Sequence, residues 1–255
     1  YRLNLAPLGE PALDSRYPEF LMLARRVILC LTFSEGVLTR TKRFNGGDYR
    51  YTQAFSWSGD ADELMLIDIT RSGPWPGFPD FLASYTYQKG VDIPVTAGGN
   101  VRSVEYARKL LNSGADKIVI SYAGKEIYKE ISYQFGAQAL VAGLDYGPGH
   151  PRSCAGALSE LADVSRECVA LVAGEILLTS IDRDGSLGGY DLDALRTVLS
   201  SVGVPVVIAG GCGAWAHMKQ AFEVGAQGAS TAVIHHLAPS VMRACKQYLA
   251  AHRGN

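Results

Sequence analysis

Two halves of the chain repeat each other. The segment 91–121, VDIPVTAGGNVRSVEYARKLLNSGADKIVIS, matches the segment 202–232, VGVPVVIAGGCGAWAHMKQAFEVGAQGASTA. Both read as a strand, a Gly-Gly turn, a helix, a Gly-Ala pair and a second strand. A further match joins DELMLIDITRS at 62 to GEILLTSIDRD at 174, so the repeat spacing is 111 to 112 residues. Such an internal repeat predicts two similar halves related by a pseudo-twofold axis, with sites occurring in pairs.

Short apolar runs recur along the chain with helix-like segments between them. Near-continuous apolar strands that alternate with amphipathic helices indicate a parallel sheet covered by helices. Eight such units predict a closed (βα)8 TIM barrel, an α/β fold that 255 residues can fill as one domain. The runs lie at 27–31, 63–68, 93–96, 117–120, 139–142, 175–179, 205–208 and 229–233.

Composition narrows the function classes. The net charge of −1 gives no electrostatic footprint for nucleic acid or an anionic membrane. No apolar run reaches the roughly 18 residues that a membrane span needs. The five cysteines are odd in number and form no Cys-x-x-Cys pair, which favours free thiols in a reducing cytoplasm over disulfides or a zinc site.

The stretch 174–191, GEILLTSIDRDGSLGGYD, combines a buried strand with polar groups and glycines. The apolar run 176–178 is followed at once by Thr179, Ser180, Asp182, Arg183 and Asp184. Barrel enzymes present their chemistry in this way, at the carboxyl ends of the strands. A strand followed by an acidic, glycine-rich turn without function fits the residues equally well.

The repeat also contains two Gly-Gly turns, Gly98-Gly99 and Gly210-Gly211, after the third and seventh strands. Backbone N–H groups at a glycine turn before a helix can cradle a phosphate, helped by the helix dipole. A single Gly-Gly pair is usually only a turn. Its recurrence in both halves favours two phosphate cradles facing each other across the barrel mouth.

The run LLTSIDRDGSLGGYD closely resembles the signature of the cyclase subunit of imidazole glycerol phosphate synthase, a (βα)8 barrel of histidine biosynthesis. The resemblance covers about residues 22–250 and is closer than that to the sister isomerase barrel. It implies an ammonia-dependent cyclase–lyase in the cytoplasm that acts on a phosphorylated, ribonucleotide-type substrate and needs no cofactor or metal. It also implies a heterodimer with a class I glutaminase subunit.

The same resemblance divides the chain. Residues 22–26 read like the start of the family, whereas residues 1–21 contain three of the eleven prolines and show no clean periodicity. They also lack the basic start and apolar centre of a signal peptide. We expect 1–21 to be an N-terminal extension or cloning remnant and 22–255 to be the single barrel domain.

The acid–base pair of the family is altered. The repeat aligns the end of strand one, at Thr32, with the end of strand five, at Asp145. The family has aspartate at both positions, working as general acid and base in ring closure. A threonine hydroxyl can hydrogen-bond, but it does not titrate near neutral pH. Asp184 adds another carboxylate at the same mouth, while Asp145 alone could be a strand-end cap.

The phosphate contacts implied by the resemblance have diverged in part. Asn100 stands where the family has a third glycine, Ser121-Tyr122 replaces Asn-Thr, and Ala209 and Val233 replace serines. Losing a donor to an apolar group can cost roughly 1–3 kcal/mol. The implied phosphate-binding positions are Gly98, Gly99, Asn100, Ser121, Arg40 (a lysine in the family), Thr179, Gly185, Gly210, Gly211 and Ala232.

The opposite end of the predicted barrel carries charges. Arg26, Glu63, Lys117 and Glu175 lie at or near the starts of strands one, two, four and six. They could form a stabilising ring, with residues from alternate strands converging in one layer. The resemblance implies more, because these positions match the gate through which ammonia from the glutaminase enters. Asp116 matches a residue at the interface between the subunits.

Gate positions that match those of the family, beside a changed mouth, leave several functions open. One alternative is a diverged paralogue that supplies ammonia for amidine formation on a nucleotide sugar in surface-polysaccharide synthesis, whose sequences the run 39–44 resembles. Another is a non-catalytic, phosphate-binding barrel that regulates a glutaminase. The phosphoribosyl barrels of the tryptophan pathway are a weaker, fold-level alternative.

Overall fold

Eight parallel strands form a closed ring. They are β1 (Arg26–Ser34), β4 (Glu63–Asp68), β5 (Val95–Gly98), β6 (Lys117–Ser121), β7 (Leu140–Tyr146), β8 (Glu175–Ser180), β9 (Val206–Ala209) and β10 (Gly228–Thr231). Each pairs with the next, and β10 pairs with β1 to close the ring. The computed structural model describes residues 25–51, 61–88, 91–150, 153–232, 234 and 241–251. The prediction for residues 1–21 lies outside this range, and the prediction of an α/β (βα)8 TIM barrel is confirmed.

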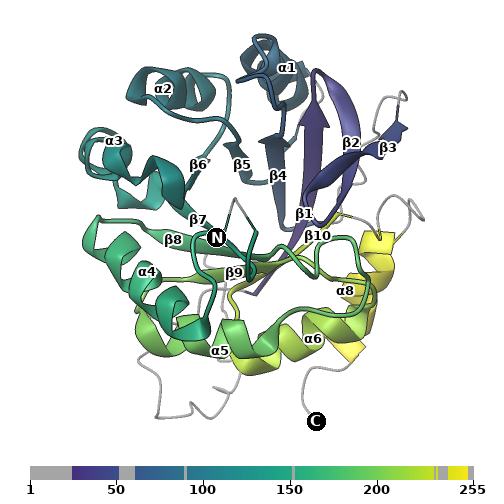
Figure 1. Cartoon of the computed structure of the whole chain (residues 1–255). Coiled ribbons are helices and arrows are strands. Elements are labelled where there is room, and N and C mark those ends of the chain that lie inside the picture. Colours follow the sequence, from purple (N-terminus) through teal and green to yellow (C-terminus); the bar gives the residue numbers. More distant parts are fainter. Residues whose placement is uncertain are drawn as a thin grey trace, which may run out of the picture.

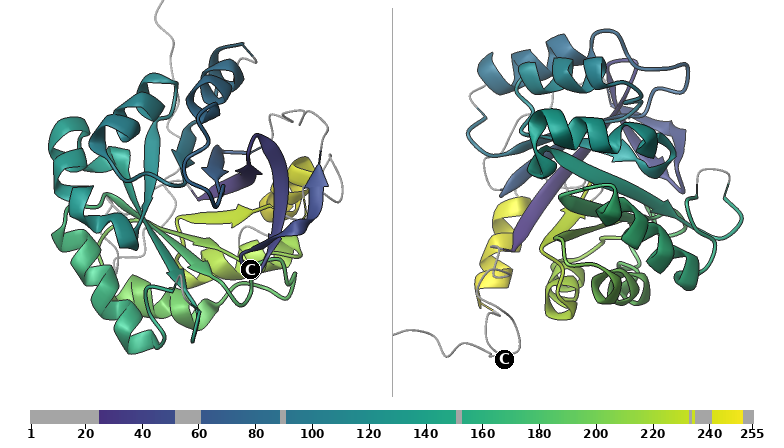
Figure 2. Two further views of the ribbon diagram at one scale, coloured as in Figure 1. Left: turned by 45° about the horizontal axis from the view of Figure 1, so that its top comes forward. Right: turned by 90° about the vertical axis from the view of Figure 1, so that its left-hand side faces the viewer.

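Helices surround the ring of strands (Figure 1; Figure 2). They are α1 (Phe78–Ala83), the π-helix η2 (Ser84–Gln88), α2 (Val104–Asn112), the 3-10 helix η3 (Tyr122–Ile127), α3 (Tyr128–Phe135), the 3-10 helix η4 (Ala137–Ala139), α4 (Leu158–Ala170), α5 (Leu192–Ser201), α6 (Trp215–Val224) and α8 (Val241–Ala251). Within the described ranges, no helix is long and apolar enough to cross a membrane.

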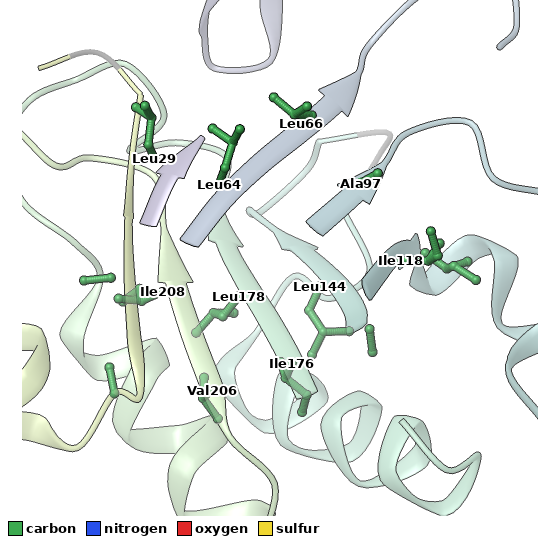
Figure 3. Close-up of a cluster of buried hydrophobic side chains, with 14 of the residues drawn as sticks. Leu29, Leu64, Leu66, Ala97, Ile118, Leu144, Ile176, Leu178, Val206 and Ile208 are labelled. Carbon is green, nitrogen blue, oxygen red and sulfur yellow. The ribbon is translucent and has the colours of Figure 1, made fainter. Parts of the chain in front are cut away.

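The strands bury side chains on both faces, because successive residues point alternately inward and outward. Outward residues pack against the helices in one large core, part of which is drawn in Figure 3. A smaller core fills the ring and contains Ile28, Met65, Val119, Val141, Leu177 and Val207. This alternation tells which side chains face the interior at each end of the barrel, where the predicted sites lie.

Two strands that follow a proline begin later than the sequence predicted. β5 starts at Val95 rather than at 93, and β9 starts at Val206 rather than at 205. Pro94 and Pro205 precede these strands and have no N–H to donate. Their carbonyl groups nevertheless accept hydrogen bonds from Leu64 and Ile176 of the neighbouring strands, at 2.9 Å each. The repeated proline therefore marks the entrance to the strand in both halves.

A hairpin outside the ring was not predicted. β2 (Val37–Lys42) pairs antiparallel with β1 and with β3 (Asn45–Tyr51), and it leaves the ring beside β1 (Figure 1). Its turn places two non-glycine residues, Arg43 and Phe44, at φ values of 51° and 58°. Such left-handed residues cost free energy and persist where surrounding contacts hold them.

Candidate active site and charged ring

The charged side chains at the amino-terminal end of the barrel form one closed ring. The Arg26 guanidinium donates one hydrogen bond from Nη1 to Glu63 and one from Nη2 to Glu175. Lys117 Nζ lies 3.0 Å from Glu63 Oε2 and 2.8 Å from Glu175 Oε2. Each carboxylate therefore meets both cations. The predicted charged layer is confirmed as a geometry.

The ring departs from the expected alternation of strands. Its members come from β1, β4, β6 and β8, so two are on adjacent strands. The register partner of Arg26 on β10 is Gly228, which has no side chain. A Cβ at Gly228 would lie 2.8 Å from both Ile28 Cδ1 and Val207 Cγ2, so a side chain there would require these neighbours to shift. Arg26, on β1, thus fills the part of the charged layer to which the neighbouring strand β10 contributes only backbone.

Burial and pairing act together on this ring. The side chain of Glu63 is 1% exposed and accepts a further hydrogen bond from Thr96 Oγ1, at 2.6 Å. Burial lowers the pKa of Arg26, but the hydrogen bond and charge of Glu175, together with those of Glu63, outweigh it and raise that pKa. Arg26 therefore stays charged although the apolar interior core begins directly above it.

Asp116 has a local partner. Its Oδ2 accepts from the Val95 N–H at 2.8 Å, and its own N–H donates to the Val95 carbonyl, also at 2.8 Å. The same pair of bonds joins Asp62 to Val27, at 2.9 Å each. Asp116 is exposed beside the ring, but its carboxylate also secures the start of β5. The interface role implied by the resemblance remains a prediction.

A pocket of about 590 Å³ opens on the same face as the ring. Tyr87, Ile93, Pro94, Leu111 and Asp116 are among its lining residues. The side chain of Tyr87 is 68% exposed. This end of the barrel therefore combines a buried charged ring with a hollow of mixed polarity beside it.

Thr32 and Asp145 lie at the opposite end of the barrel, on β1 and β7. Thr32 and Asp145 lie on the same faces of their strands as the interior residues Ile28 and Val141, so both side chains point into the barrel. The Thr32 hydroxyl donates to the Thr39 carbonyl of β2. The two predicted positions thus face the same mouth from β1 and β7, and the threonine hydroxyl is hydrogen-bonded to the hairpin.

Asp184 anchors the β2–β3 turn. Its Oδ2 accepts from the Phe44 N–H at 3.1 Å, and its carbonyl accepts from the Arg43 N–H at 3.1 Å. Burial raises the pKa of Asp184, opposed by the hydrogen bonds of Phe44 and Thr41 and by the charge of Arg40. The following Gly185 lies against the same hairpin, since a Cβ there would be 2.5 Å from the Thr41 oxygen.

Asp184→Asn is expected to raise the melting temperature at pH 7. Because the folded pKa of Asp184 lies above its ordinary 3.8, the wild type loses stability as pH rises through that folded value, whereas the amide does not ionise. The advantage of the variant should vanish at low pH, near the ordinary pKa. Thermal unfolding at both pH values measures it, with the exposed Asp182→Asn as control. An equal effect at both pH values would contradict the assignment.

The first Gly-Gly turn is shaped by its neighbours. Gly99 has a φ of 95°, and a Cβ there would lie 1.9 Å from the Asp68 oxygen. Asn100 also has positive φ, and its Nδ2 donates to the carbonyls of Thr70 and Gly73 at 2.8 and 3.2 Å. The Asn100 amide therefore braces the β4–α1 segment. Only its backbone remains suited to an anion.

Ser121 and Tyr122 turn in different directions. Ser121 is exposed at the carboxyl end of β6. The Tyr122 hydroxyl donates to the Glu167 carboxylate on α4 and accepts from Lys125 Nζ at 2.7 Å. Tyr122, which replaces the family's threonine, thus places its hydroxyl outside the barrel, against α4. The structure places no hydroxyl at that position of the mouth.

The second Gly-Gly turn is also tightly packed. A Cβ at Gly211 would lie 2.2 Å from the Gly189 oxygen, and Gly189 donates its N–H to the Gly211 carbonyl at 2.8 Å. Gly210 similarly approaches the Ser180 oxygen. Thr179, the residue before the end of β8, pairs with Ala209, and Ala232 follows β10. Close packing alone requires glycine at these turns, so phosphate binding there remains a prediction.

Metal ligands do not gather in the described ranges, where no group of three or more histidine, cysteine or acidic side chains could hold an ion. All five cysteines are free thiols. Burial raises the pKa of the Cys30 thiol, inside the barrel, to about 12.

Comparison with known proteins decides the family. A family model described as "Histidine biosynthesis protein" matches residues 29–238. The chain belongs to this histidine biosynthesis family. It is 32% identical over 248 residues to the imidazole glycerol phosphate synthase subunit HisF of Exiguobacterium sibiricum, covering 90% of this chain and 98% of that protein.

Two further relatives carry the same name. The HisF subunit of Endomicrobium trichonymphae is 35% identical over 243 residues, which cover 89% of this chain and 93% of the relative. That of Myxococcus xanthus is 36% identical over 249 residues, with 89% and 96% covered. The match therefore spans nearly the whole barrel of each relative, and this chain is of the HisF type or a diverged paralogue.

Proposed function

We propose that this chain is an ammonia-using barrel subunit of the imidazole glycerol phosphate synthase type. It receives ammonia at its amino-terminal face from a class I glutaminase and delivers it to a phosphorylated, ribonucleotide-type acceptor at the carboxyl-terminal mouth. The named reaction is the cyclase–lyase step of histidine biosynthesis, in the cytoplasm. The observation that carries the proposal is the closed ring of Arg26, Glu63, Lys117 and Glu175 below an apolar interior.

The composition of this end supports a gate. A ring needed only for stability could be replaced by packed apolar residues, often without loss. Here the cations keep limited contact with water, since the side chains of Arg26 and Lys117 are 19% and 17% exposed. Lys117 therefore borders both solvent and interior. The adjacent pocket and the exposed Tyr87 give a partner protein a surface to contact.

The altered side chains at the carboxyl-terminal mouth support a second candidate function. Thr32 donates to the hairpin, Asn100 to the β4–α1 segment and Tyr122 to α4, so three positions of the family site are engaged elsewhere. These departures favour a different acceptor, as in a paralogue that supplies ammonia for amidine formation in surface-polysaccharide synthesis. The acceptor is then still phosphorylated, and the backbone of the two Gly-Gly turns binds it.

The proposal is tested by purifying this chain together with a glutaminase from the same genome. We expect a heterodimer and a glutaminase rate that rises when this chain is added. Lys117→Ala should abolish that stimulation, whereas Lys219→Ala, which removes a surface partner of Glu223 on α6, should not. Thermal unfolding confirms that both variants fold. Failure to bind at micromolar concentration would leave the ring as a stabiliser and overturn the proposal.

A further inference from the structure

Three segments meet above the barrel mouth. The Phe44 ring, on the β2–β3 turn, contacts the His150 ring edge-on, with centroids 6.1 Å apart and planes at 84°. The backbone of Phe44 is at the same time bound to Asp184, at 3.1 Å. The turn therefore joins the segment after β7 to the segment after β8, and His150 is held where these segments converge.

The position of His150 follows from a short turn after Asp145. The His150 N–H donates to the Gly147 carbonyl at 3.3 Å, and Ser153 Oγ accepts from the Gly147 N–H at 2.9 Å. The Cys154 N–H donates to the Asp145 carbonyl at 2.8 Å. The turn thus closes on the end of the strand that carries Asp145, which keeps His150 and Asp145 at one strand end.

The chemistry proposed above needs two titrating groups. When ammonia condenses with a carbonyl carbon, a C–N bond forms and the C–O bond breaks. The nitrogen loses two protons, and the oxygen gains two and leaves as water. Efficient transfer uses side chains that can both take and give a proton near neutral pH. Thr32 cannot do this, and Asp184 accepts hydrogen bonds from the β2–β3 turn.

Resting on the proposed function, we propose that His150 is the second catalytic acid–base residue of this mouth, acting with Asp145. Histidine is the side chain whose charge changes between about pH 5 and 8. It stands in for the carboxylate that strand one lacks, but it reaches the substrate from the segment after strand five. Asp145 takes one proton from nitrogen in each of two steps and releases it to solvent, and His150, reprotonated from solvent, delivers one proton to the departing oxygen in each step.

Charged residues lie on the segments that meet at His150. Arg43 flanks Phe44 on the turn, while Asp182 and Asp184 come from the segment after β8 and Asp145 from β7. Asp182 lies close to this turn, since its Oδ2 is 3.8 Å from a Cβ placed on Gly147.

The test is the pH dependence of ammonia-driven turnover with the histidine-pathway substrate. His150→Gln should lower kcat about 10²-fold or more and remove one limb of the pH–rate profile. Pro148→Ala, exposed on the same turn, is the matched control and should leave both unchanged. Phe44→Leu should lower kcat less and keep both limbs, because it only loosens the imidazole. Unchanged turnover of His150→Gln in an active wild type would overturn this inference and leave the proposed function standing.

A second measurement applies if the wild type shows no turnover, which would contradict the histidine-pathway acceptor itself. The His150 Cε1–H resonance is assigned by its absence in His150→Gln and followed while glycerol 3-phosphate is added. A saturable shift is expected, because His150 borders the site that binds the phosphorylated acceptor. No shift at millimolar concentration would overturn the placement of His150 at that site.

Discussion

Glu63→Ala is expected to lower the free energy of unfolding by about 2–4 kcal/mol. Removing one partner of a buried ion pair typically costs about 3–5 kcal/mol, because the remaining charge stays desolvated. The cost is smaller here because the two cations left behind, Arg26 and Lys117, reach water in part and keep Glu175. Thr96 would also lose the acceptor of its 2.6 Å hydrogen bond.

Urea unfolding at neutral pH measures this difference. Glu223→Ala is the matched control, since that glutamate is 51% exposed and meets Lys219 at 3.4 Å. An exposed pair of this kind contributes about 0–1 kcal/mol. If Glu63→Ala cost no more than Glu223→Ala, the ring would not be a stabilising element, and its retention would need a purely functional reason.

The second large effect concerns Thr32→Asp. It restores a carboxylate at the end of strand one, opposite Asp145, and general acid–base assistance is typically worth about 10²–10⁴-fold. If His150 already supplies the second group, the full gain should appear when Thr32→Asp is combined with His150→Gln. A smaller gain is then expected in the wild-type background.

Steady-state turnover with ammonia at several pH values measures both backgrounds. Thr32→Asn is the control, since it has nearly the same shape and does not titrate. An ionised aspartate cannot donate to the Thr39 carbonyl, so we expect Thr32→Asp to lose about 1 kcal/mol of stability. A gain from asparagine equal to that from aspartate would show that proton transfer is not what strand one lacks.

The sequence predicted the barrel and the ring because both depend on strands. Buried strands leave a plain apolar pattern, and the repeat fixes their order. A charge at the start of such a strand, as at Glu63 or Glu175, is rare enough to be noticed. The layer itself could be expected from closure of the barrel, but the contribution of Arg26 from strand one depended on Gly228, whose lack of space appears only in three dimensions.

The mouth could be predicted less well than the barrel, because the orientation of its side chains depends on contacts with loops. Asn100 and Tyr122 were recognised as departures from the family, yet their hydrogen bonds to Thr70 and Glu167 depend on segments that the motifs do not include. The hairpin was missed for a physical reason. Its turn uses Arg43 and Phe44 at positive φ, where glycine or asparagine would have signalled a hairpin.

The ring breaks the internal symmetry of the barrel in a specific way. Glu63 and Glu175 are 112 residues apart and begin equivalent strands of the two halves. Lys117 begins β6, but its counterpart at the start of β10 is Gly228. The acids are therefore duplicated and the lysine is not. A protein that recognises this face meets one orientation rather than two equivalent ones, and the barrel should accept a single partner in a fixed rotational setting.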